Sequence, residues 1–157
     1  MRRKDREITD RREILHLIDQ CDTIRLGISD QEGVYIVPLS FGYSYDEAML
    51  TFYFHSATEG RKVSILSNNP AAAFEMDTAH VFREKETGCA CTMEYACVMG
   101  TGKAVLLEKM EEKLKALGLL LAHYTDRKPP LQETAAAQTN VYKLEAKWED
   151  ISCKIHR

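Results

Sequence analysis

Apolar and polar residues along the chain follow two periods, and each period predicts one type of element. Asp10-Arg-Arg-Glu13 matches a capping box, and apolar residues at helical spacing follow it, so we expect an amphipathic helix over residues 9–21. Residues 23–29 alternate between apolar and polar, and residues 34–43 are rich in β-branched and aromatic side chains. With a turn at residues 30–33 between them, these two segments predict a β-hairpin.

The same two periods continue to the end of the chain. They predict strands over residues 49–54, 71–78, 92–107, 139–148 and 151–155, and helices over residues 58–69 and 108–124. Gly100 and Gly102 predict a bulge or sharp bend in the long strand. Short strands joined by hairpins, with helices at the margins, favour a mainly β (α+β) fold whose antiparallel sheet is closed or nearly closed into a barrel. The βα alternation and the Gly-x-Gly-x-x-Gly motif of a Rossmann domain are missing from the sequence.

Pro38 lies inside the second predicted strand. Proline has no N–H to donate to a sheet ladder, so the strand must lie at an edge or be bulged there. The neighbouring backbone groups are then available to a ligand, although a simple strand irregularity explains Pro38 equally well at this point.

Composition narrows the class of protein. With 157 residues, 45% of them hydrophobic and 29% charged, the chain fits a single domain (residues 1–157) with an ordinary core. The formal net charge of -3 argues against nucleic-acid binding. No apolar run is long enough for a membrane span, and the charged start lacks the apolar region of a secretory signal. Asp5 and Glu7 interleave with the basic residues at this start, so we expect a flexible, solvated arm at residues 1–8 and not a nucleic-acid tail.

Five cysteines, an odd number at irregular spacing, favour reduced thiols and therefore a cytoplasmic protein. Cys89-Ala-Cys91 has the wrong spacing and no second ligand pair for a structural zinc site. We therefore interpret the pair as ordinary small thiols and expect no bound metal.

The segment His55–Lys62 carries the groups that a phosphate ester needs. Ser56-Ala-Thr-Glu59 matches a capping box and predicts a helix that starts near Thr58, with unpaired amides at its N-terminus. Gly60 allows close approach to the backbone, and Arg61 and Lys62 supply two cations. An ordinary capped surface helix with solvated cations competes with this interpretation.

The surrounding motifs favour the phosphate. They are Tyr35-Ile-Val-Pro-Leu-Ser-Phe-Gly-Tyr43, Phe-Tyr-Phe-His55, Ser-Ala-x-Glu-Gly-Arg-Lys62, Asn-Asn-Pro70, Met93-Glu-Tyr95 and Val98-Met-Gly-Thr-Gly-Lys103. In this order they resemble the flavin-binding split-barrel proteins related to pyridoxamine 5'-phosphate oxidase, in particular the nitroimidazole-resistance (Nim) branch. The resemblance covers about residues 9–155.

This resemblance implies an antiparallel six-stranded split β-barrel that forms a homodimer, with FMN in two clefts between the subunits. The cofactor-binding positions that it implies are Val37, Pro38, Leu39, Ser40, His55, Ser56, Arg61, Lys62, Tyr95 and Cys97. Val37–Leu39 would line the flavin ring, and residues 55–62 would flank the ribityl chain and phosphate. Tyr95 and Cys97 would approach the flavin across the subunit interface.

Two positions depart from the family pattern. Cys97 stands where the family often has serine, and Cys153 replaces the glycine of a C-terminal Ser-Gly-Lys. The first change puts a hydrogen bond at Cys97 in question, and the second does the same for the role of Lys154.

The resemblance implies a flavin-dependent reductase that passes electrons from NAD(P)H through FMN to a small acceptor such as a nitroimidazole. His55 is the candidate catalytic residue, as a proton donor near the flavin. A histidine that simply caps the strand end or contacts the phosphate is the other interpretation. A non-catalytic module that binds FMN or haem for storage or sensing is the alternative function.

Overall fold

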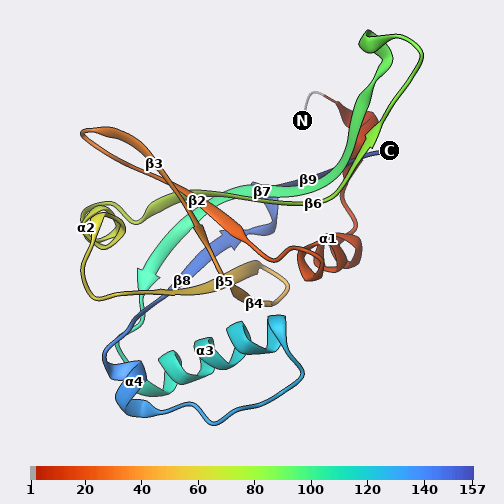
Figure 1. Ribbon diagram of the computed structural model, residues 1–157. Helices are drawn as coiled ribbons and strands as arrows, with labels where there is room; N and C mark the ends of the chain where they lie inside the picture. Colours follow the sequence, from red (N-terminus) through yellow and green to blue (C-terminus); the bar gives the residue numbers. More distant parts are fainter. Residues whose placement is uncertain (1–2) are drawn as a thin grey trace.

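The computed structural model describes residues 3–157 and builds one antiparallel sheet with helices at its margins (Figure 1). The helices are α1 (Arg11–Asp19), α2 (Arg61–Asn68), α3 (Met110–Tyr124) and α4 (Glu133–Ala137), with short 3-10 turns η1 (Lys4–Arg6), η2 (Gly88–Ala90) and η3 (Trp148–Asp150). The strands are β1 (Glu7–Ile8), β2 (Ile24–Asp30), β3 (Gly33–Leu39), β4 (Gly42–Tyr45), β5 (Met49–Ser56), β6 (Ala71–Arg83), β7 (Thr92–Leu106), β8 (Asn140–Lys147) and β9 (Ile151–His156).

The sheet is open rather than closed. Its strand order is β3-β2-β6-β7-β8-β5-β4, so β3 and β4 are the ends of the path. Strand β7 pairs with β8 near its end and with β9 nearer its start, and β9 also pairs with β1. The antiparallel β fold with marginal helices is confirmed, but the six-strand count is wrong. Residues 3–157 form nine strands, among them the short strands β1 and β4.

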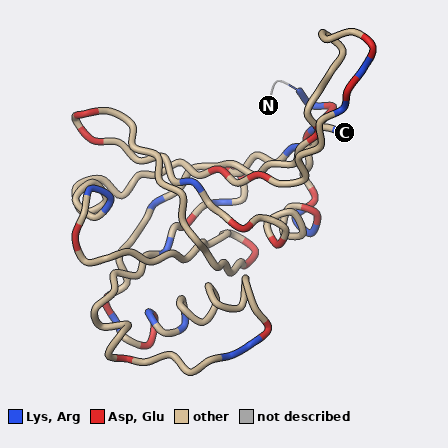
Figure 2. Tube along the Cα trace, viewed as in Figure 1, with Lys and Arg blue, Asp and Glu red and all other residues tan. Residues whose placement is uncertain are grey.

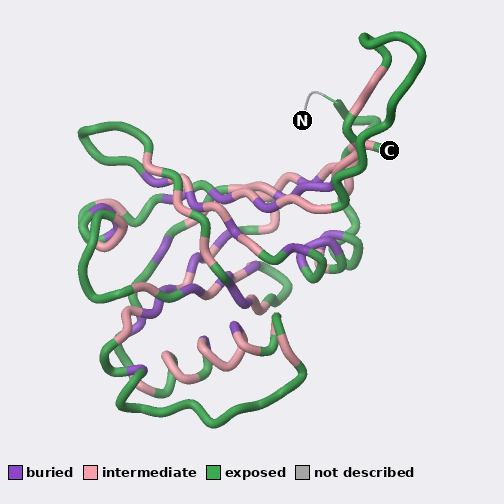
Figure 3. Tube along the Cα trace, in the orientation of Figure 1, coloured by how far each residue is buried: buried purple, intermediate pink, exposed green. Residues whose placement is uncertain are grey.

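The core lies on the inner face of this curved sheet and beneath α1 (Figure 3). Its largest fully buried side chains include Phe41, Phe52 and Phe54, and the rings of Phe52 and Phe74 lie 4.9 Å apart. Helix α1 begins where the sequence predicts, because Asp10 accepts hydrogen bonds from the amides of Arg12 and Glu13 at 2.7 and 3.2 Å. This N-cap anchors the amphipathic helix whose apolar face closes one end of the core.

The single strand predicted over residues 34–43 is two strands. Strand β3 ends at Leu39, and Phe41 turns fully into the core. The Phe41 amide donates to the hydroxyl of Tyr124 in α3 at 2.9 Å, and a Cβ on Gly42 would collide with the α3 backbone at Leu120. The chain therefore changes direction here to pack against α3, which periodicity could not indicate.

Strands β6 and β7 continue past the body as a hairpin arm, defined here as residues 79–93 (Figures 1 and 3). The bulge predicted at Gly100 and Gly102 is wrong, because both pair in register with β6. The register shift lies between Thr78 and Val81, where Ala79 has a φ of 58°. The two glycines instead allow close packing: a Cβ on Gly100 would come within 2.8 Å of the Phe74 ring.

The N-terminal segment is paired where it is described. Glu7 and Ile8 lie opposite Lys154 and Cys153 of β9. Met1 and Arg2, the rest of the arm predicted at residues 1–8, lie outside the described residues. Among the helices of residues 3–157, none has the length and apolar character that crossing a membrane requires.

Candidate functional site

Strand β3 is an edge strand, which resolves the position of Pro38. It pairs with β2 alone, and Pro38 lies opposite Arg25 without a register shift. Its side chains alternate: Tyr35, Val37 and Leu39 pack against the core, whereas Val34, Ile36 and Pro38 face outward. Val34 and Ile36 are 74% and 65% exposed, so the strand presents an apolar row beside unpaired backbone groups. A flat, largely apolar ligand could pack against this row and form hydrogen bonds with the unpaired backbone groups.

The second part of the predicted site is the end of β5. His55 is exposed, and its backbone pairs with Val141 of β8. Ser56 is half-buried, and its hydroxyl donates to the carbonyl of Ala57 at 2.7 Å. Both side chains therefore stand at the point where the sheet passes into the loop before α2.

Helix α2 begins later than predicted. Its N-cap is Gly60, with a φ of 131°, and its first helical residue is Arg61. The Ser64 amide makes the first helical bond, to the Gly60 carbonyl at 3.1 Å. The capping box predicted at Ser56 and Glu59 is wrong, because the positive φ of Gly60 starts the helix without a side-chain cap. The amides of residues 61–63 thus precede the first helical bond, as an anion site needs.

Arg61 is bound to the turn of the β2–β3 hairpin. Its guanidinium lies 3.4 Å from the Asp30 carboxylate, 3.5 Å from that of Glu32 and 5.0 Å from the centre of the Tyr35 ring. Figure 2 shows this arrangement as an acidic hairpin turn beside the basic start of α2. Although burial opposes it, hydrogen bonds from the Glu32 amide and from Arg61 lower the pKa of Asp30. A phosphate at Arg61 would share the cation with these carboxylates.

Lys62 has a different environment from Arg61. The side chain is half-buried, and this burial lowers the pKa of its ammonium group. A partly desolvated cation next to free helix amides suits an anionic ligand.

Tyr95 and Cys97 lie at the other end of the long ladder between β6 and β7. Helix α2 leads into Ala71, which pairs with Lys103, whereas Ala96 pairs with Thr78. These pairs are roughly 23 Å apart at about 3.3 Å per residue. Within one chain, the predicted site residues therefore lie in two separate places.

The structure shows the surroundings of Cys97, Cys153 and Lys154, whose roles the sequence left open. Cys97 is buried, which raises the pKa of its thiol. Cys153 is also buried, and burial raises its pKa to about 12. The Lys154 ammonium lies 5.7 Å from the centre of the Tyr95 ring, so Lys154 packs against β7 beside Tyr95.

These features have counterparts in a known family. The sequence model of the family described as pyridoxamine 5'-phosphate oxidase matches residues 10–153, which is most of the chain. The chain belongs to this family. The resemblance found in the sequence is therefore confirmed, while no protein with a curated description matches the chain.

Solved structures agree with this family assignment. A candidate 5-nitroimidazole antibiotic resistance protein from Bacteroides thetaiotaomicron is 31% identical, with 95% of this chain and 86% of that chain covered and a TM-score of 0.81. The flavocytochrome Anf3 from Azotobacter vinelandii (16% identity, 100% and 72% covered, TM-score 0.81) shares the fold. So does a FAD- and haem-binding protein from Mycobacterium smegmatis (14% identity, 97% and 74% covered, TM-score 0.82).

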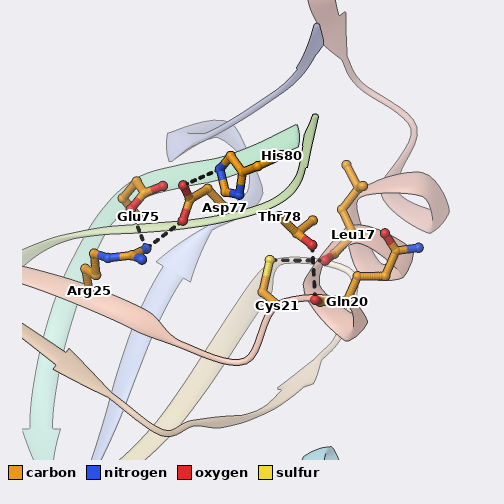
Figure 4. Close-up of polar contacts among 8 residues, drawn as sticks. All are labelled: Leu17, Gln20, Cys21, Arg25, Glu75, Asp77, Thr78 and His80. Atoms are coloured by element: carbon orange, nitrogen blue, oxygen red, sulfur yellow. Dashed lines mark hydrogen bonds and ion pairs between the residues drawn. The ribbon is translucent and has the colours of Figure 1, made fainter. Parts of the chain in front are cut away.

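Sequence patterns alone missed the residues that reach Arg61. They indicated only a turn at residues 30–33, because nothing local connects Asp30 with an arginine 31 residues away. They also missed a polar network on the sheet (Figure 4), in which Arg25 bonds Glu75 at 3.2 Å and Asp77 at 2.7 Å. His80, at the β6 bulge, adds an Nε2–Asp77 contact of 2.8 Å. Sheet register creates both clusters, so a single sequence carries little signal for them.

Cys89 and Cys91 lie at the tip of the hairpin arm, in and directly after η2. Cys89 is exposed, and the Cys91 sulfur accepts a hydrogen bond from the Lys85 amide at 3.4 Å. In the part of the chain that the structure describes, no cluster of three or more His, Cys, Asp or Glu residues has the arrangement of a metal site.

Proposed function

We propose that the protein is an FMN-dependent reductase that works as a homodimer. The observation that carries this proposal is the start of α2, where Arg61, Lys62 and three helix amides meet in a chain of the pyridoxamine 5'-phosphate oxidase family. Together they offer two cations and several N–H donors to one phosphate. The exposed apolar row on β3 supplies a surface for the flavin ring.

The residues present would suit both the phosphate and the ring of FMN. A phosphate monoester carries nearly two negative charges at neutral pH, which would compensate the buried charge of Lys62. When bound, FMN would accept a hydride from NAD(P)H and pass electrons to a small acceptor. The chain's residues would orient the ring along β3 and keep water from its inner face. Because the Bacteroides relative is a candidate nitroimidazole resistance protein, a nitroimidazole is the acceptor that we propose.

His55 is the residue that we propose as proton donor. Its imidazole is exposed at the end of β5, six residues before Arg61, next to the loop that leads to the proposed phosphate site. An imidazolium group can donate a proton, which reduction of an acceptor requires.

The separation of the two half-sites supports the homodimer that we propose. In such a dimer, Tyr95 and Cys97 would approach the flavin from a second copy, because within one chain they lie far along β7 from α2. The outward row Val34, Ile36 and Pro38 would be covered in such a dimer. We place the protein in the cytoplasm, where its free thiols stay reduced.

The proposed binding site is tested by the double variant Arg61→Ala/Lys62→Ala. Each charge-assisted hydrogen bond is worth roughly 1.5–3 kcal/mol, so FMN affinity should fall by about 3 kcal/mol or more while the fold is kept. The affinity is measured by titration of the apoprotein with FMN, and circular dichroism checks the fold. Unchanged FMN retention would mean that α2 is an ordinary surface helix that does not bind the phosphate.

Turnover needs a separate experiment. Steady-state oxidation of NADH and NADPH by the flavin-loaded protein is measured with and without a nitroimidazole. We expect the acceptor to stimulate the rate. A flavin-loaded protein without any acceptor-stimulated rate would be a binding module for storage or sensing. A haem spectrum would mean that the protein binds haem instead of FMN.

A further inference from the structure

A hollow of about 400 Å³ lies between α3 and the loop of residues 125–132, which leads to α4. Figure 1 shows this loop running beside the helix. Helix α3 packs on β4 and β5 with its buried residues Ala116 and Leu120, and neither of them lines the hollow. Ligand sites in proteins usually measure about 300–1,000 Å³, so the hollow has room for a small molecule. Its lining residues differ from those of the proposed flavin site, so it is a separate candidate site.

The walls of the hollow are apolar. Gly118, Leu121 and Ala122 lie on one face of α3, three and four residues apart, and Pro129 and Leu131 of the loop stand opposite. Leu121 is half-buried and Leu131 is 37% exposed, so water still reaches part of this apolar surface. An apolar group placed in the hollow would remove that surface from water, which favours binding.

Gly118 keeps the hollow open. Glycine destabilises the interior of a helix relative to alanine, and the helical backbone at Gly118 does not require it. Packing does not require it either. A Cβ at this position would meet only Leu131 Cδ1 within 4 Å, at an ordinary contact distance of 3.9 Å. The missing side chain therefore leaves space for a ligand, in contrast to Gly42 and Gly102, where a Cβ would collide with the backbone.

The rim of the hollow is basic. Arg127 and Lys128 are exposed and line it, and Figure 2 shows the basic segment of this loop. Asp126 is the acidic residue of the lining, so two cations face one carboxylate and leave one net positive charge. The salt bridges formed among residues 3–157 include neither Arg127 nor Lys128. The rim thus has the charge that an anionic group needs.

Hydrogen bonds at the end of α3 fix the position of this rim. The Thr125 amide donates to the Leu121 carbonyl at 3.0 Å, and the Thr125 hydroxyl accepts from the Arg127 amide at 3.1 Å. The two bonds turn the chain directly after the helix and hold the Arg127 backbone beside the hollow. The following Pro129 and Pro130 restrict the loop further, because proline fixes its own φ.

We infer that this hollow binds a small carboxylate with an apolar body, of the size of benzoate or a medium-chain fatty acid. The apolar body lies against Gly118 and Ala122, and the carboxylate lies at the rim. There Arg127 donates two parallel hydrogen bonds and Lys128 adds a compact charge. An inorganic anion would leave the apolar walls without a contact, and a neutral apolar molecule would leave the two cations without one. The site is independent of the flavin and of its turnover.

Two variants and one control test this site on the purified full chain. Gly118→Leu fills the hollow from a helical position where leucine is a better helix former than glycine. Arg127→Gln/Lys128→Gln removes the charge of the rim at exposed positions. Lys115→Gln is the matched control, because Lys115 is an exposed cation of the same helix outside the lining residues. Circular dichroism and the flavin content check that each variant keeps its fold.

The probes are benzoate and octanoate, with benzyl alcohol and 1-octanol as their neutral counterparts. Backbone amide shifts of the ¹⁵N-labelled protein locate each probe, and their concentration dependence gives its dissociation constant. We expect at least one carboxylate to shift the amides of Leu121 and Ala122 saturably and to bind about fivefold or more tightly than its alcohol. Whichever carboxylate binds more tightly identifies the body of the ligand as a ring or a chain.

Gly118→Leu should weaken carboxylate binding by about tenfold or more, because the leucine side chain occupies the same space. Arg127→Gln/Lys128→Gln should weaken it by about fivefold or more, to the level of the alcohols, while Lys115→Gln stays within about twofold. Absence of saturable shifts at Leu121 and Ala122, or carboxylate binding that survives Gly118→Leu, would overturn the site. Alcohols that bind as tightly as the carboxylates would overturn its preference for an anion. None of these results bears on flavin binding, which the variants of α2 test.

Discussion

At the scale of single residues, the two cations at the start of α2 have different environments, although they are adjacent in the sequence. Arg61 is exposed and forms salt bridges with Asp30 and Glu32, whereas Lys62 is half-buried and burial lowers its pKa. The sequence predicted both as phosphate ligands from residue type and spacing. The contact of Asp30 and Glu32 with Arg61 depends on where the β2–β3 hairpin lies in space, and no local sequence pattern indicates this position.

The lowered pKa of Lys62 predicts a pH dependence of flavin binding. A bound phosphate favours the charged ammonium, so FMN affinity should fall as pH rises through the Lys62 pKa, at a lower pH than for an ordinary lysine. Stability of the ligand-free protein moves the other way. Because the folded pKa lies below the unfolded one, the unfolded state binds more protons, and stability rises with pH across that window.

FMN titrations between neutral and alkaline pH check this prediction. Lys62→Arg keeps its charge throughout and should bind FMN with a nearly flat profile over the same range. A wild-type profile as flat as that of the arginine variant would show that Lys62 does not contact the phosphate.

His55 provides a second prediction at this scale. Replacing it with Gln removes the proton donor but keeps a polar side chain on the exposed end of β5. The acceptor-dependent turnover number should fall by about 10²-fold or more, with FMN affinity nearly unchanged. Loss of FMN affinity with normal turnover of the loaded fraction would instead make His55 a phosphate contact.

At the scale of elements, periodicity located most helices and strands, and failures occur where tertiary contacts decide. The α1 N-cap, the edge position of β3 and the end of α2 before Pro70 were predictable from local chemistry. The break at Phe41 depends on α3, and the real start of α2 depends on the positive φ of Gly60. The sequence pattern also attributed Gly100 and Gly102 to a bulge that lies elsewhere in the ladder.

Close packing at Gly102 predicts a local loss of stability. A Cβ there would collide with the Glu145 carbonyl oxygen on β8 and lie 3.2 Å from Leu144 Cδ1. Gly102→Ala should therefore destabilise the protein by about 1–3 kcal/mol, as overpacking does. Gly88→Ala is the control, because a Cβ on this residue of the hairpin arm would meet no other atom within 4 Å. Thermal unfolding of both variants tests this, and equal melting temperatures would contradict the role given to Gly102.

At the scale of the whole molecule, an open sheet leaves two features without a partner in one chain. One is the exposed apolar row of β3, and the other is the distance between α2 and Tyr95. Family resemblance predicted a dimer with shared flavin sites, and single-chain geometry supports that proposal without testing it. Oligomeric state depends on surface complementarity between copies, which a single sequence does not display.

Dimerisation through β3 can be tested by adding charge to its outer row. Ile36→Lys puts a cation at a 65% exposed apolar position that a symmetric interface would bury. We expect the variant to be monomeric by light scattering and to lose flavin in parallel. Leu131→Lys, at another exposed apolar position far along the chain, should leave the mass and the flavin content unchanged. A dimeric Ile36→Lys protein would move the interface away from β3.

The visible spectrum of the purified protein, with chromatographic identification of the released cofactor, tests the central claim most directly. A flavin-binding protein of this family should be yellow, show flavin absorption and release FMN or FAD on denaturation. A haem spectrum, or a colourless protein that takes up neither flavin, would contradict the account.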